Sequence, residues 1–325
     1  MKAEKPSESF KPGPGVEISA VIVNYNGSEF LPENLETLKA QQPGFQRILV
    51  VDNASTDNSR KLLASRPEID TLLLEKNIGY AAAANRGISM CGTSLVLVAN
   101  ADIRTEPGFV SAIRDHLKEY PETGLISPLL LRFDGKTVDS AGQECSPAFY
   151  PREKGYNQPL DKVQVKAGPV FSVCGAATII NRRAFSGVVA DNAFYDEDFF
   201  MFWEDFDLGW IAKEADIPVY FTPRARVHHF RSATLQSGFM RKVALALARP
   251  PRLRFHLVKN RYLTLIKHFR WRRHWSLIPA IMIKDLVWVG LLTITTPQII
   301  IWLVRTGPQF RRAWRKRRNA PDLRK

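Results

Sequence analysis

The sequence predicts an α/β protein whose main domain is a doubly wound sheet and whose last quarter is a basic helical region. Two observations predict the sheet. Apolar, strand-like segments alternate with helical segments through about the first 120 residues, the order expected of successive βαβ units. The apolar segments also lack alternation with polar residues, as expected of strands that helices cover on both faces.

Four segments have the composition of buried strands. Residues 18–23 and 47–51 are apolar and rich in Val and Ile, and β-branched side chains favour extended backbone. Residues 71–74 and 94–99 continue the series with Leu and Val. A later strand is expected at residues 219–221, where Val-Tyr-Phe occurs.

The segments between these strands have helical features. Residues 28–41 place Phe and Leu at helical spacing and end before a Pro-Gly pair, which stops a helix. A shorter helix is expected at residues 58–65. Residues 78–90 are rich in alanine, a strong helix former. Residues 107–120 begin with a proline, which the first turn of a helix accepts.

Polar residues follow all four of the first strands. Ligands of doubly wound sheets bind at the carboxyl ends of the strands, so these positions predict a binding site. Taken singly, each is also typical of an ordinary turn. The positions are Asn24, Tyr25, Asn26, Asp52, Asn53, Lys76, Asn77, Asn100 and Asp102.

Composition and missing motifs exclude several classes of protein. Of the 325 residues, 45% are hydrophobic and 24% charged, which excludes a wholly disordered chain and a polytopic membrane protein. Neither GxGxxG after the first strand nor GxxxxGK[ST] occurs, so a nicotinamide dehydrogenase and a P-loop NTPase are disfavoured. Residues 1–16 are polar and are expected to be a disordered lead-in without a signal peptide.

Three features of the sequence are candidates for catalytic chemistry. Residues 195–210 interleave acidic with aromatic side chains, where loss of water would make a carboxylate a stronger general base. A helix with an acidic first turn and an aromatic core face has the same pattern. Asp102 either caps the next helix or joins a Mg²⁺ or Mn²⁺ site. His228 and His229 are expected in a loop after the strand at residues 219–221. One of them could bind a metal or a diphosphate, or both could face solvent.

Several motifs occur in one order over roughly residues 17–240, and together they identify a family. This series resembles glycosyltransferase family 2, which has the GT-A fold with a mixed sheet, and most closely its rhamnosyltransferase-like branch. The motifs read Val21-Ile-Val-Asn-Tyr-Asn26, Val51-Asp-Asn-Ala-Ser-Thr-Asp-Asn-Ser59, Lys76-Asn-Ile-Gly-Tyr80 with Asn85-Arg-Gly87, Asn100-Ala-Asp102, Gly175 onward with Asn181-Arg-Arg183, and Trp203-Glu-Asp-Phe-Asp-Leu208.

The resemblance implies a role for each of these positions. Asp205 matches the catalytic base, with Trp203 and Glu204 on the acceptor side. Asp102 matches the last acid of the metal-binding DxD element. His229, with Ser232 and Thr234 after it, fits the family's downstream histidine motif better than His228 does, and is expected to bind the metal together with Asp102. The donor-binding positions are Tyr25, Asn26, Asp52, Asn77, Gly79, Asn85 and Asn100. Of these, Asp52 matches the acid that hydrogen-bonds the base of the donor nucleotide.

The resemblance also implies the reaction. A divalent cation, Mg²⁺ or Mn²⁺, stabilises the diphosphate leaving group of a nucleotide-sugar, and one base that deprotonates an acceptor hydroxyl implies inversion at the anomeric carbon. The sugar is expected to be rhamnose and the acceptor a glycan or a lipid-linked glycan of the cell envelope. In this chain the DxD element reads Asn100-Ala-Asp102 and lacks its first carboxylate. A non-catalytic scaffold that binds a nucleotide-sugar is therefore the alternative. A nucleotidyltransferase is disfavoured, because no basic phosphate loop follows the first strand.

Charge separates the chain into two parts. Residues 1–240 hold 25 Lys and Arg against 30 Asp and Glu, whereas residues 241–325 hold 21 against 2. We therefore expect a catalytic domain at residues 17–240 and a basic, partly apolar helical region at residues 241–325. Residues 286–304 carry no charge and are just long enough, as one helix, to cross the hydrocarbon core of a bilayer.

The basic region is expected to bind an anionic membrane surface. Basic residues flank the uncharged stretch on both sides, which conflicts with a single crossing by the positive-inside rule. An interfacial or re-entrant hairpin at the cytoplasmic face of the cell membrane fits better, and a soluble helical tail remains the alternative. Nucleic acid is a less favoured partner, because its grooves do not bind long apolar segments.

Overall fold

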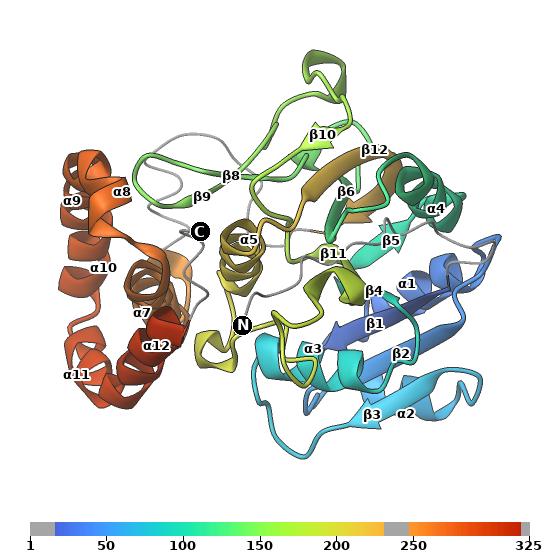
Figure 1. Cartoon of the computed structure of the whole chain (residues 1–325). Coiled ribbons are helices and arrows are strands. Elements are labelled where there is room, and N and C mark those ends of the chain that lie inside the picture. The colour runs from blue at the N-terminus through green and yellow to red at the C-terminus, as the bar shows by residue number, and fades with distance from the viewer. Residues whose placement is uncertain (1–16, 231–246, 320–325) are drawn as a thin grey trace.

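The computed structural model describes residues 17–230 and 247–319 of the chain (Figure 1). The expected lead-in at residues 1–16, the expected domain boundary at residue 240, and Ser232 and Thr234 therefore lie outside the described residues. Within the described residues, ten strands form one sheet and two form a small ribbon. The sheet strands are β1 (Ile18–Asn24), β2 (Arg47–Asp52), β3 (Asp70–Leu73), β4 (Leu95–Asn100), β5 (Ile103–Thr105), β6 (Leu125–Arg132), β7 (Val138–Ser140), β10 (Gly168–Pro169), β11 (Ala177–Asn181) and β12 (Val219–His229), and the ribbon strands are β8 (Gln143–Cys145) and β9 (Pro151–Glu153).

The main sheet is mixed, as the family resemblance implies. Its order is β10-β12-β6-β11-β4-β1-β2-β3, with β5 beside β12 and β7 beside β6. Strands β3, β2, β1 and β4 are parallel, β11 is antiparallel to β4 and β6, and β12 is parallel to β6. The carboxyl ends of β1, β2 and β4 therefore meet at one edge, where polar residues were expected.

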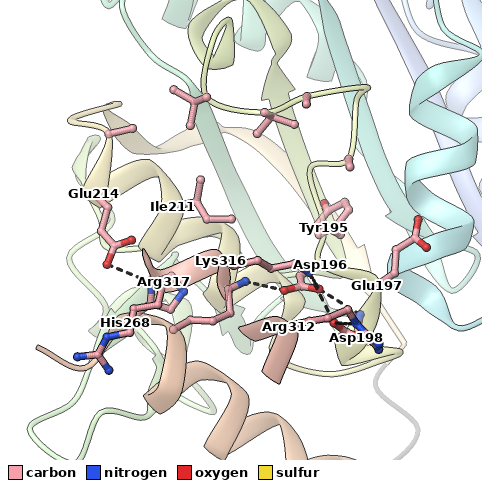
Figure 2. A pocket seen from close by; sticks show the side chains of 16 residues that line it. Tyr195, Asp196, Glu197, Asp198, Ile211, Glu214, His268, Arg312, Lys316 and Arg317 are labelled. Atoms are coloured by element: carbon pink, nitrogen blue, oxygen red, sulfur yellow. Dashed lines mark hydrogen bonds and ion pairs between the residues drawn. The ribbon is translucent and has the colours of Figure 1, made fainter. Parts of the chain in front are cut away.

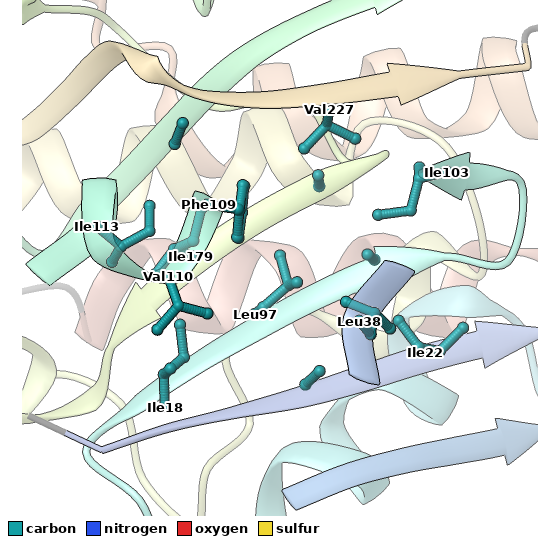
Figure 3. Packing of buried hydrophobic residues seen from close by; sticks show 14 of the residues in the cluster. Ile18, Ile22, Leu38, Leu97, Ile103, Phe109, Val110, Ile113, Ile179 and Val227 are labelled. Carbon is teal, nitrogen blue, oxygen red and sulfur yellow. The ribbon is translucent and has the colours of Figure 1, made fainter. Parts of the chain in front are cut away.

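Helices cover both faces of the sheet, which explains why its central strands are apolar throughout. Ile18 and Ile22 of β1 pack with the helices on one face (Figure 3), whereas Val21 and Val23 pack with the helices on the other. The first face carries α1 (Leu31–Lys39), α2 (Ser59–Ala64) and α4 (Phe109–Glu119), and the second carries α3 (Tyr80–Ser89) and α5 (Glu204–Glu214).

The expected strands and helices of the first 120 residues are confirmed, with small shifts at their ends. The first helix begins at Leu31 rather than at residue 28, because the preceding residues form a turn in which Phe30 N donates to Gly27 O. One expectation is wrong. His228 and His229 do not lie in a loop, because β12 continues through both residues and pairs with β5 and β6.

The described part of the C-terminal region, residues 247–319, is largely helical and lies beside α5 (Figure 1). The uncharged stretch at residues 286–304 does not form one helix, because the backbone leaves the helical conformation at Thr296 before Pro297. An overlapping segment, Trp271–Thr295, is long and apolar enough to cross a membrane, and an 18-residue stretch within it has a mean hydropathy of 1.9. The region comprises α7 (Pro251–His268), α8 (Trp271–His274), α9 (Ile278–Lys284), a π-helical turn (Asp285–Val289), α10 (Gly290–Thr295), α11 (Gln298–Arg305) and α12 (Gly307–Asn319).

Buried ion pairs join α7 to the sheet domain. Lys267 Nζ lies 2.8 Å from Asp196 Oδ2 and 2.5 Å from Asp207 Oδ2, and His268 Nε2 lies 2.8 Å from Asp207 Oδ1. All four side chains are buried. Burial opposes the charge on Lys267, but the two carboxylates dominate and raise the pKa of its ammonium above the ordinary value. Removing one partner of such a cluster leaves a buried charge without compensation.

A crevice of about 770 Å³ separates α12 from the residues around α5, and ion pairs cross it. Figure 2 shows Lys316 reaching Asp196 and Arg312 reaching Asp198. Lys316 Nζ lies 2.5 Å from Asp196 Oδ1, and Arg312 Nη2 lies 2.5 Å from Asp198 Oδ1. The C-terminal region is therefore attached to the acidic segment that contains the expected base.

We expect Lys267→Met to lower the free energy of unfolding by about 3–5 kcal/mol, because Asp196 and Asp207 would lose their buried cation. Urea denaturation measures the change. The control is Lys118→Met, since the Lys118 side chain is 71% exposed in its pair with Asp115 and such pairs contribute about 0–1 kcal/mol. Equal losses in the two variants would contradict a structural role for the buried cluster.

Candidate active site

A cavity of about 500 Å³ brings together the expected acid, base and histidine. It lies where the carboxyl end of β4, the start of α5 and the end of β12 meet. Six of the residues singled out in the sequence line it: Asn100, Asp102, Trp203, Glu204, Asp205 and His229. Its walls also contain Tyr80 and Gly175, which belong to the family motifs, and residues that the sequence did not single out, including Gln143, Tyr150, Glu153 and Arg249.

Asp205 is held by donors from three parts of the chain. Its Oδ2 accepts from the backbone N of Gly175 at 2.7 Å and from Gln143 Nε2 at 2.9 Å, and its Oδ1 accepts from the backbone N of Phe206 at 2.8 Å. An added Cβ at Gly175 would lie 3.2 Å from Asp205 Oδ2, so a side chain there would push the carboxylate aside by a few tenths of an ångström. The carboxylate is therefore fixed in direction at the first turn of α5.

Burial raises the pKa of two neighbouring carboxyl groups, those of Asp205 and Glu204. Loss of water raises the pKa of Asp205 above its ordinary value, against the hydrogen bonds that favour its charged form. Burial, followed by the charge of Asp205, raises the pKa of Glu204 from 4.5 to about 8. A carboxylate with a raised pKa is better able to take a proton near neutral pH, so the chemistry expected of residues 195–210 agrees with the geometry.

The backbone before α5 adopts an unusual conformation. Phe200, Phe202 and Trp203 have positive φ angles of 66°, 68° and 72°, which cost energy for residues other than glycine. Asn260 of α7 stabilises the segment, because its Nδ2 donates to the carbonyl oxygens of Phe202 and Met201 at 2.7 Å and of Phe199 at 3.0 Å. The C-terminal region thus supports the loop that precedes Asp205.

His229 and Asp102 face each other in the cavity. His229 Nε2 lies 3.5 Å from Asp102 Oδ2, and His229 Nδ1 lies 2.8 Å from Asp139 Oδ2. Burial opposes protonation, but hydrogen bonds to Asp102 and Asp139 raise the pKa of His229 to about 9. Because neighbouring residues of a strand point to opposite sides, His228 points elsewhere and pairs with Glu106 at 2.8 Å. His229 is the histidine of the cavity.

The pair of Asp102 and His229 fits a divalent cation. Asp102 Oδ1 is buried and has no hydrogen-bond partner, and Asp139 holds His229 Nδ1 in the way that metal-binding histidines are commonly oriented. Among residues 17–230 and 247–319, no cluster of three or more His, Cys, Asp or Glu could hold a metal. A cation here would take its remaining ligands from phosphate and water, as Mg²⁺ usually does.

The first expected donor residues lie around the ends of β1 and β2, where Asp52 and Asn26 are hydrogen-bonded to neighbouring residues. Asp52 is fully buried, and its carboxylate accepts from Asn24 Nδ2 at 3.0 Å, Arg60 Nε at 2.8 Å and Ser55 N at 3.1 Å. Asn26 Oδ1 accepts from the backbone N of Thr56 at 2.7 Å. Tyr25 is 53% exposed and so is available for stacking.

The other expected donor residues shape the turn before α3. Asn77 Oδ1 accepts from the backbone N of Gly79 at 2.9 Å. Gly79 has a φ of 88°, and an added Cβ would lie 2.6 Å from Phe200. Asn85 is buried and exchanges two hydrogen bonds with the backbone of Tyr195, at 2.7 and 3.0 Å. Tyr25, Asn26, Asp52, Asn77, Gly79 and Asn85 are not among the residues that line the 500 Å³ cavity.

Comparison with known proteins gives one family and several relatives. The model of the family "Glycosyl transferase family 2" matches residues 19–188. The N-acetylglucosaminyl-diphospho-decaprenol L-rhamnosyltransferase of Mycobacterium tuberculosis is 28% identical over 240 residues, which cover 66% of this chain and 76% of that protein. The low-salt glycan biosynthesis hexosyltransferase Agl10 of Haloferax volcanii is 24% identical over 207 residues, covering 62% and 64%.

Solved structures share the fold. The crystal structure of GalNAc-T7 with UDP, GalNAc and Mn²⁺ superposes with a TM-score of 0.58 at 12% identity, covering 90% of this chain and 57% of that one. The crystal structure of Staphylococcus aureus TarS 1-349 in complex with UDP-GlcNAc gives a TM-score of 0.53 at 13% identity, covering 93% and 88%. At these identities the likeness establishes the GT-A architecture alone.

We expect Glu204→Gln to become more stable relative to the wild type as the pH rises from 4.5 to 8. In that window folded Glu204 keeps a proton that the unfolded chain has released, so wild-type stability falls with rising pH. Denaturant unfolding at several pH values measures the difference, with the exposed Glu75→Gln as the control. A difference that does not depend on pH would show that Glu204 ionises normally.

Proposed function

This chain belongs to glycosyl transferase family 2, and we propose that it transfers a sugar from a nucleotide-diphosphate donor to an acceptor hydroxyl with inversion. The observation that carries the proposal is the position of Asp205. Its carboxylate is fixed at the start of α5, is partly removed from water and lines the same cavity as Asp102 and His229. Direct displacement at the anomeric carbon requires a base on the acceptor side and a group that binds the leaving phosphates on the donor side. Asp205 would be the base, and Asp102 with His229 would be on the phosphate side.

Asp205 would accept the proton of the acceptor hydroxyl while that oxygen attacks the anomeric carbon. The hydrogen bonds from Gly175 and Gln143 orient the carboxylate, and its raised pKa increases its basicity. Trp203 and Glu204 line the cavity beside it, in keeping with the acceptor side proposed for them. The donor diphosphate would leave from the side of Asn100 and Asp102.

Asp102 and His229 would hold a Mg²⁺ or Mn²⁺ ion together with the donor phosphates. When bound, such an ion stabilises the negative charge that develops on the leaving diphosphate. Asp139 would keep His229 oriented, and the unpartnered Asp102 Oδ1 provides a ligand atom. The donor nucleotide and ribose would lie toward Tyr25 and Asn26, at the ends of β1 and β2.

The proposed substrates follow from the relatives. A rhamnosyl donor and a lipid-linked acceptor are supported by the name of the mycobacterial relative, and the cell envelope is the proposed destination of the glycan. The cytoplasmic face of the cell membrane is the proposed location, because the strongly basic region after residue 240 favours anionic lipid. The alternative, a scaffold that binds a nucleotide-sugar without transferring it, is supported only by the missing first carboxylate at Asn100.

We expect Asp205→Asn to abolish sugar transfer while donor binding stays close to that of the wild type. The side chain acts on the acceptor proton and not on the nucleotide. Transfer to an acceptor analogue and calorimetric titration with the nucleotide-sugar measure the two properties. The exposed Asp161→Asn is the matched control. Wild-type transfer by Asp205→Asn would exclude it as the base, and a wild-type protein that binds donor without transfer would favour the scaffold.

We expect Asp102→Ala to weaken donor binding about tenfold or more in Mn²⁺ and much less in a chelator, because loss of metal-site ligands and their partners typically costs 10- to 100-fold. His229→Ala should behave in the same way. Calorimetry in the two buffers measures the effect. If Asp102→Ala weakens binding equally with and without Mn²⁺, Asp102 is not a metal ligand.

A further inference from the structure

We infer that the C-terminal helices bind flat to one face of an anionic lipid bilayer through an exposed apolar surface, without crossing it. This inference deepens the proposed membrane location and rests on it, but it concerns the geometry of binding. The outer apolar face is defined here by six side chains of the described helices and their connections: Trp275, Ile283, Leu286, Ile294, Ile301 and Val304.

Most of the side-chain surface of the outer apolar face is exposed to solvent. Leu286, Ile294 and Val304 are 80%, 79% and 77% exposed. Ile283 on α9 and Ile301 on α11 are 66% and 57% exposed, so the exposed apolar side chains continue along the stretch from α9 to α11. Contiguous exposed apolar surfaces mark binding sites for proteins or membranes.

The two charges at the middle of the segment Trp271–Thr295, on Lys284 and Asp285, point the other way, toward the sheet domain. Asp285 pairs with Arg261, whose side chain is 1% exposed and also donates to the carbonyl oxygen of Ala148 at 3.2 Å. The Lys284 ammonium lies 4.8 Å from the centroid of the Tyr150 ring. These contacts hold the middle of the segment against a wall of the active-site cavity, to which Tyr150 belongs.

A crossing is disfavoured by the same two charges. Lys284 and Asp285 lie at the middle of the 25-residue segment, so a crossing would place them at the centre of the bilayer, where charged side chains are costly. It would also break the contacts with Arg261 and Tyr150. Binding flat keeps both sets of contacts and buries only the outer apolar face, as interfacial helices do.

The surrounding charge favours an anionic lipid surface over a protein groove. Exposed arginines flank the outer apolar face on both sides: Arg272, Arg273, Arg305, Arg311 and Arg315. A flat orientation lets both groups lie against the same leaflet, whereas a crossing would send one group to each side. Arg312 and Lys316 instead pair with Asp198 and Asp196 across the crevice in Figure 2.

Flotation of the full-length protein with preformed vesicles tests the surface. We expect binding to vesicles of phosphatidylcholine with phosphatidylglycerol, and weaker binding to phosphatidylcholine alone. The double variant Leu286→Glu/Ile294→Glu should lose most of the bound fraction, because both side chains leave water on binding. Leu73→Glu, which changes a 51% exposed leucine on β3, should bind like the wild type.

Thiol labelling from outside the vesicles distinguishes flat binding from a crossing. We introduce Ser276→Cys or Gln298→Cys, one at each end of the segment, and add a maleimide that does not cross lipid. Flat binding predicts that both positions react, whereas protection of one of them would show a crossing and overturn the inference. Absence of flotation on both vesicles, or equal flotation of the wild type and the double variant, would also overturn it.

The outcome is separable from the proposed catalytic function. Donor binding and transfer to a short soluble acceptor are measured on the double variant in the absence of vesicles, and both should equal those of the wild type. Loss of flotation with normal transfer supports the surface. Normal flotation by a wild-type protein that transfers no sugar would refute the catalytic proposal and leave the surface intact.

Discussion

The buried contact of Lys267 with Asp196 and Asp207 is the interaction on which the rest of the structure depends. It fixes α7 against α5 and holds one residue on each side of the proposed base, Asp196 before it and Asp207 after it. Asn260 lies about two turns before Lys267 on α7. Its side chain donates hydrogen bonds to the carbonyl oxygens of the segment that precedes Asp205. The direction of Asp205 is therefore determined jointly by the sheet, through Gly175, and by the C-terminal helices.

The sequence predicts the sheet well, because burial on both faces imposes apolar strands that composition alone reveals. It also predicts that Asp102, Asp205 and His229 belong to one site, and the structure places all three in one cavity. It does not point to Asp139 or Gln143, since neither lies in a recognisable motif. Their positions depend on β7 pairing with β6 and on β8 pairing with β9, which are contacts that no local pattern encodes.

The basic region shows a second limit of sequence reasoning. Charged residues are rarely buried, so an Arg- and Lys-rich segment is naturally expected to be solvated. In the structure Lys267 and His268 are buried on α7 because Asp196 and Asp207 lie opposite them. Arg261 is also buried, but its partners are Asp285 and the carbonyl oxygen of Ala148. Some of the excess acidic residues before residue 240 therefore pair directly with some of the excess basic residues after it.

The order of synthesis gives this interaction a consequence in time. A nascent chain completes the acidic segment around Asp196 and Asp207 some sixty residues before Lys267 and His268 are added, as their numbers show. Domains generally begin to fold from the N-terminus during translation, so the sheet can form while its carboxylates still face water. The proposed base gains its final environment only after α7 has left the ribosome, and any product that terminates before α7 would retain the sheet without an assembled catalytic centre.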